Sequence, residues 1–62
     1  MNALRKTIKK ALDGVTKDNA PNVYAAIQTE NGYKTIEDMI INMMIDNNFT
    51  ASGCIPQIEE MI

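Results

Sequence analysis

The ten residues from Ile36 to Ile45 constrain this chain most, because seven of them are large and apolar in a protein of only 62 residues. At about 100° per residue, four of the seven fall within one arc of roughly 100°, a usual width for a core-facing stripe. Ile41 and Ile45 lie on nearly the opposite side, and Met44 lies between the two sets. A helix apolar over about two-thirds of its circumference needs cover on more than one face. These three residues therefore predict an association surface.

The small size of the chain also points to association. A domain near this length buries only about 60% of the surface that its unfolded form exposes, and disulfides, metals or oligomerisation usually add stability. Cys54 is the sole cysteine, so it forms no disulfide within the chain, and the sequence has no histidine for a zinc site. We therefore expect a homo-oligomer, most simply a two-fold dimer, with a protein interface formed by Ile41, Met44 and Ile45.

Composition excludes some classes of protein. The hydrophobic content of 45% and the charged content of 23% are typical of a folded globular chain. No apolar run approaches the roughly 18 residues of a membrane span, and no apolar stretch follows the basic N-terminus as it would in a signal peptide. We expect a single helical domain over residues 1–62, cytoplasmic and without membrane association, in which Cys54 stays a thiol.

The spacing of apolar residues predicts an all-α domain of three to four short helices, at approximately 3–13, 21–30, 36–46 and 54–62. Pro21 suits the first position of the second helix, and Asn31-Gly32 would close it. Thr35 is the predicted N-cap of the third helix. The last helix is predicted to start near Cys54, because Pro56 lacks an amide donor and fits a first turn.

Two of these helices have clear apolar sides. In the first helix the apolar face consists of Leu4, Ile8, Ala11, Leu12 and Val15. In the last helix it consists of Ile55, Ile58, Met61 and Ile62, and Glu59 and Glu60 are predicted to face outward.

Asn31-Gly32 also permits a different local structure. This dipeptide is a strong turn signal between antiparallel strands, so residues 22–36 could form a hairpin in an α+β fold. The adjacent alanines at positions 25 and 26 are poor strand residues, whereas Pro21 and Gly32 bracket a helix of normal length. We favour the helix and keep the hairpin as the alternative.

Charge is unevenly distributed along the chain. Residues 1–17 hold five basic residues against Asp13 alone, and residues 18–62 hold seven carboxylates against Lys34 alone. Such asymmetry indicates a partner of opposite charge, or attraction between two copies. The candidate charged contacts to a partner are Arg5, Lys6, Lys9 and Lys10.

The sequence contains no pattern that predicts a catalytic, cofactor-binding or metal site. Cys54 lacks a histidine that could act as its base, so we interpret it as a small buried or half-buried residue. The carboxylates of Glu37-Asp38 and of Glu59-Glu60 are adjacent in sequence, so each pair diverges on a helix. We expect no enzymatic activity, no cofactor and no bound metal.

The resulting hypothesis is a non-enzymatic protein–protein interaction module that self-associates and binds an unidentified protein. Small acidic chains without catalytic motifs are similar in kind to phage-encoded inhibitors of bacterial enzymes, a likeness of size and composition alone, so an inhibitor or regulator is the favoured role. One alternative is a nucleic-acid-binding module that uses the basic face of the first helix, although the pI of about 4.8 disfavours it. The other is an acidic mimic of DNA.

Overall fold

The computed structural model describes residues 2–62, which form four α-helices. Their bounds are Asn2–Asp13 (α1), Pro21–Ala26 (α2), Glu30–Asn47 (α3) and Ala51–Met61 (α4). No strand occurs within the described residues, so the predicted all-α fold is confirmed and the alternative hairpin at 22–36 is wrong. None of the helices in this part of the chain is long and apolar enough to cross a membrane.

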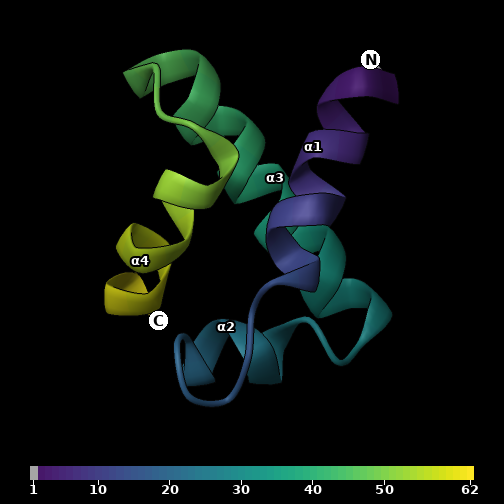
Figure 1. Cartoon of the computed structure of the whole chain (residues 1–62), viewed down its shortest axis with the longest axis vertical. Helices are drawn as coiled ribbons and strands as arrows, with labels where there is room; N and C mark the ends of the chain where they lie inside the picture. The colour runs from purple at the N-terminus through teal and green to yellow at the C-terminus, as the bar shows by residue number, and fades with distance from the viewer. Residues whose placement is uncertain (1) are drawn as a thin grey trace.

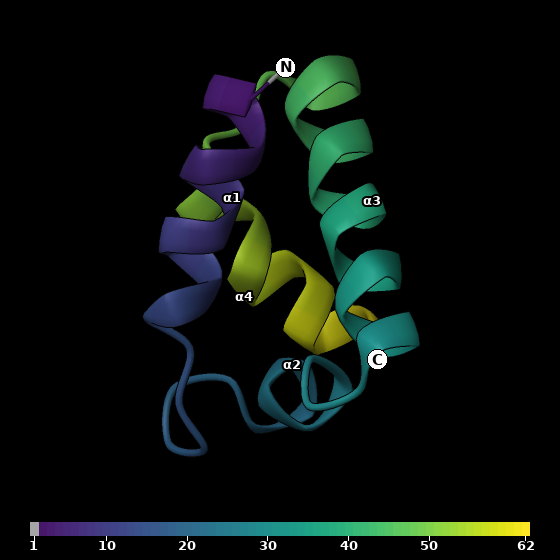
Figure 2. The same cartoon turned by 90° about the vertical axis from the view of Figure 1, so that its right-hand side faces the viewer.

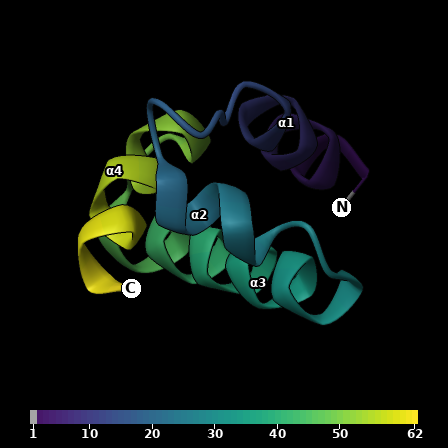
Figure 3. The ribbon, with the colours of Figure 1, turned by 90° about the horizontal axis from the view of Figure 1, so that it is seen from below.

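The helices surround one small core. Helices α1 and α3 stand side by side and run in opposite directions, and α4 packs behind them (Figures 1 and 2). Helix α2 lies across the lower end, as the view from below shows (Figure 3). The buried apolar residues come from every helix and from the connection between α1 and α2: Ile8, Leu12, Val15, Ala20, Val23, Ile36, Ile40, Ala51, Cys54 and Ile58.

Helix α1 follows the predicted pattern closely. Ile8, Leu12 and Val15 are buried, while Leu4 and Ala11 are half-buried at the margins of the same face. A period of 3.6 residues is sufficient to predict this face, because α1 covers the core along a single side.

Helix α2 begins at Pro21 as predicted, but its N-terminal cap comes from elsewhere in the chain. Ala20 provides no side-chain cap. Instead, the Glu59 carboxylate accepts hydrogen bonds from the N–H groups of Asn22 and Val23, at 3.0 and 2.9 Å. The outward orientation predicted for Glu59 is therefore wrong, because the side chain turns toward the positive end of α2 and satisfies two of its free donors.

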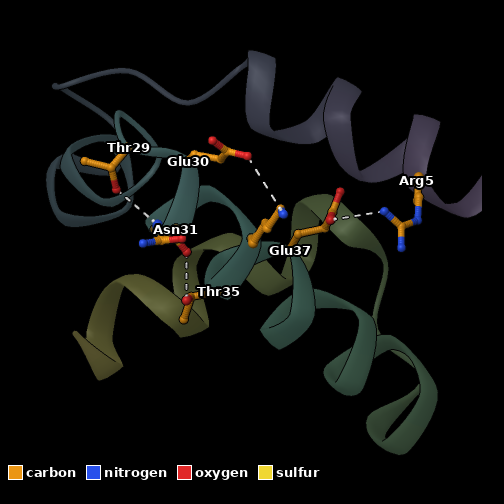
Figure 4. Close-up of polar contacts among 8 residues, drawn as sticks. Arg5, Thr29, Glu30, Asn31, Thr35 and Glu37 are labelled. Carbon is orange, nitrogen blue, oxygen red and sulfur yellow. Dashed lines mark hydrogen bonds and ion pairs between the residues drawn. The ribbon is translucent and has the colours of Figure 1, made fainter.

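The start of α3 differs from the predicted one by six residues. Thr29 is the N-cap, and its hydroxyl accepts a hydrogen bond from the Gly32 N–H at 3.0 Å (Figure 4). Thr35 lies inside α3, where its hydroxyl donates to the Asn31 carbonyl at 2.9 Å. The predicted second helix to residue 30 and the predicted third helix from residue 36 were wrong at this junction, because Asn31-Gly32 forms the first turn of α3.

Close packing explains why glycine occupies position 32. A Cβ atom there would come within 1.9 Å of the Ala26 carbonyl oxygen in the last turn of α2. The glycine therefore lets the two helices meet at a tight corner, rather than closing a helix or a hairpin.

Helix α3 ends at Asn47, and Asn48 adopts the left-handed conformation with a φ of 58° that asparagine tolerates well. Helix α4 begins at Ala51 rather than near Cys54, because the Thr50 hydroxyl caps it by accepting from the Gly53 N–H at 3.1 Å. Pro56 consequently lies in the second turn of α4, not in the first as predicted. Because proline has no backbone N–H, α4 lacks the hydrogen bond that another residue at position 56 would donate.

Candidate protein-interaction surface

The three predicted interface residues lie on α3 but differ in exposure. Ile45 has 70% of its surface exposed, whereas Ile41 and Met44 are half-buried and pack against the edge of the core. Their neighbour Ile40 is fully buried. The apolar band of α3 thus runs continuously from the core to the surface, and Ile45 is the part of it that the chain leaves uncovered.

An ion pair between α1 and α3 shows on which side of α3 the apolar band reaches the surface. Arg5 Nη1 of α1 lies 3.7 Å from Glu37 Oε1 of α3 (Figure 4). Ile41 follows Glu37 by one helical turn, so it lies on the same side of α3, toward α1. The Arg5 side chain is 68% exposed and that of Glu37 only 14%, so water screens the pair and its contribution to stability is less than about 1 kcal/mol. The ion pair therefore adds little stability, but it identifies the side of α3 that faces α1.

The four basic candidates are all exposed on α1, but they do not share one edge. Arg5 reaches toward α3, and Lys9 follows it by one turn along the same edge. Lys10 lies on the opposite edge, where its side chain borders α4. The basic face predicted from the sequence is therefore divided between the two sides of α1.

The opposite edge of α1 borders a shallow groove that sequence reasoning missed. The groove has a volume of about 460 Å³ and runs between α1 and the first turns of α4. No periodic signal predicts it, because its walls come from segments about 40 residues apart. Its lining residues are Lys10, Ala11, Gly14, Val15, Asn19, Ser52, Ile55 and Pro56.

Three further apolar side chains are exposed outside the predicted surface. Phe49 lies in the loop after α3, and Met61 and Ile62 lie at the end of α4. The last helix was predicted to bury Met61 and Ile62, but only Ile58 and, in part, Ile55 of that face are covered. Ile58 and Glu59 still contact the rest of the molecule, but the chain extends past the core after them, so Met61 and Ile62 remain exposed.

Two titratable side chains, those of Cys54 and Tyr33, have a pKa raised by their burial in the fold. Burial raises the pKa of the Cys54 thiol, which is wholly enclosed and directs its sulfur toward the Ile40 carbonyl at 3.9 Å. A raised pKa suppresses the reactive thiolate. Burial, followed by the nearby charges of Glu37 and Asp13, raises the pKa of Tyr33. Neither group forms part of an arrangement suited to acid–base or nucleophilic chemistry.

Across the described residues, no group of three or more cysteine and carboxylate side chains comes together in a way that could hold a metal ion. No protein-family model, no curated protein and no solved structure matches this chain.

Proposed function

We propose that this chain is a non-enzymatic protein-interaction module that self-associates as a homodimer through Ile41, Met44 and Ile45 on α3. In this proposal the assembled chain acts by binding another protein, as a small inhibitor or regulator. The observation that carries the proposal is the exposure of Ile45 at the end of an apolar band that continues into the core.

The energetic argument follows from burial. Covering an exposed isoleucine side chain is worth about 1.5–3 kcal/mol, and further apolar area on Ile41 and Met44 would be covered with it. A 62-residue chain has a small core, so this amount is a substantial part of its stability. Two copies each burying the same surface gain it twice in an isologous interface.

Absolute mass in solution tests the proposal, measured by size-exclusion chromatography with light scattering across a dilution series. The expected result is a dimer that dissociates on dilution, and Ile45→Asp is expected to leave only the 6.9 kDa monomer. Met61→Asp is the matched control, because Met61 is also apolar and 66% exposed but lies on α4. A monomer at every concentration, or equal effects of the two variants, would contradict the proposed interface.

A further inference from the structure

The two helices that border the proposed interface carry opposite charges. Helix α1 has four basic residues and one acidic residue, and α3 has four acidic residues and one basic residue. They stand side by side in antiparallel directions (Figure 2). On the face that they share, Arg5 and Lys9 make the α1 edge positive, and Glu37 and Asp38 make the α3 edge negative. The Arg5–Glu37 ion pair already links these edges within one copy.

Two copies can meet through the face formed by α1 and α3, related by a two-fold axis in either of two directions. If the two-fold axis runs along the helices, α1 of each copy lies against α3 of the other. If the axis runs across the helices, α1 lies against α1 and α3 against α3. The second arrangement places like charges opposite one another along both edges, whereas the first brings opposite charges together twice.

The position of Ile45 favours the same arrangement. The C-terminal end of α3, where Ile45 lies, is level with the N-terminal end of α1 (Figure 2). An axis along the helices preserves this level, so Ile45 meets the N-terminal half of α1 in the second copy, where the exposed Arg5 side chain can cover it with its aliphatic stem. An axis across the helices would place Ile45 against the N-terminal end of α3, where Glu30 and Lys34 are exposed.

From these observations we infer that the partner on this face is a second copy oriented with the two-fold axis along α1 and α3, so that α1 of each copy packs antiparallel against α3 of the other. The inference rests on the proposed function, since it specifies the orientation of the same dimer. In this orientation Lys9, at the middle of the positive edge, faces the middle of the negative edge, where Asp38 is exposed.

Charge reversal with a compensating reversal tests the orientation. At a salt concentration of about 20 mM, Lys9→Glu and Asp38→Lys are each expected to raise the dimer dissociation constant about tenfold, because each change alters two symmetric contacts. The double variant, with both reversals in one chain, restores the attraction and is expected to return to within about threefold of the unmodified protein. Raising the salt to about 0.5 M should reduce these differences, because the contacts are exposed.

Lys10→Glu is the matched control, because it changes the net charge by the same amount on the α4-facing edge of α1. It is expected to change the dissociation constant less than about twofold. The orientation is wrong if Lys9→Glu raises the dissociation constant no more than Lys10→Glu does, or if the double variant dimerises no more tightly than the single variants. In either case, loss of the dimer in Ile45→Asp would still support the interface itself. An unmodified protein that stays monomeric would overturn both the interface and its orientation. Circular dichroism verifies that each variant keeps its helices.

Discussion

The carboxylate of Glu59 accepts a hydrogen bond from the backbone N–H of Val23 at 2.9 Å, across 36 positions of sequence. Its other oxygen accepts from the neighbouring N–H of Asn22 at 3.0 Å, so one side chain of α4 holds the N-terminus of α2. Helix α2 has only six residues, which is too short to be stable alone. Its structure therefore depends on this contact and on the burial of Val23.

Replacing Glu59 with glutamine should lower the free energy of unfolding by about 1–2 kcal/mol, because a neutral amide offers one acceptor oxygen where the carboxylate offers two. Urea denaturation followed by circular dichroism measures the change. Glu60→Gln is the control: its side chain is exposed on the same helix, and it should alter stability by less than about 0.5 kcal/mol. If the two changes lower the free energy of unfolding equally, the contact of Glu59 with α2 does not contribute to stability.

Gly32→Ala should destabilise the protein by about 2–3 kcal/mol, because the added Cβ would collide with the backbone of α2 at Ala26. Gly14→Ala provides the comparison. A Cβ at position 14 meets only the Ala11 carbonyl oxygen at an ordinary distance of 3.5 Å, and Gly14 does not have a positive φ. This second change should leave stability unaltered or raise it by up to about 1 kcal/mol, since it restricts the unfolded chain. Thermal unfolding of both variants measures the contrast, and a tolerated Gly32→Ala would refute the tight corner between α2 and α3.

Thr29→Ala should lower the free energy of unfolding by about 1 kcal/mol, because it removes the hydroxyl that caps α3. Thr35→Ala should change it by less than about 0.5 kcal/mol, because Thr35 is an exposed residue inside the helix and alanine has a higher helix propensity. Chemical denaturation of the two variants measures the difference. The opposite order would place the start of α3 at Thr35.

The buried thiol of Cys54 should make stability fall in alkaline solution. Burial raises the pKa of Cys54 in the folded chain, so the unfolded chain loses this proton first as the pH rises past about 8.5. The folded state then binds more protons than the unfolded state, and its stability decreases by up to about 1.4 kcal/mol per pH unit until the folded thiol also ionises. Denaturation at pH 7 and pH 9.5, with a reductant present, measures this slope. Cys54→Ala should show a shallower slope over the same interval, and an unchanged slope would assign the effect to other groups.

Both helix starts that sequence reasoning misplaced share a local pattern that could have revealed them. Thr29 and Thr50 are each followed three residues later by a glycine, Gly32 and Gly53, whose N–H donates to the threonine hydroxyl. A Cβ on either glycine would lie within 3.0 Å of that oxygen. The Thr35 segment offered a competing cap with acidic residues in the following turn, and the sequence alone provided no means of ranking the two.

The sequence by itself determined the helical class, the apolar face of α1 and the large apolar band of α3, because these depend on the period of neighbouring residues along the chain. Only the tertiary structure decided how the band is divided, with Ile41 and Met44 partly covered by the core and Ile45 left exposed. It likewise decided that Glu59 caps α2 and that Arg5 pairs with Glu37. Both contacts join residues more than 30 positions apart, and a helical period holds no information about which helices will meet or at what level they will pack.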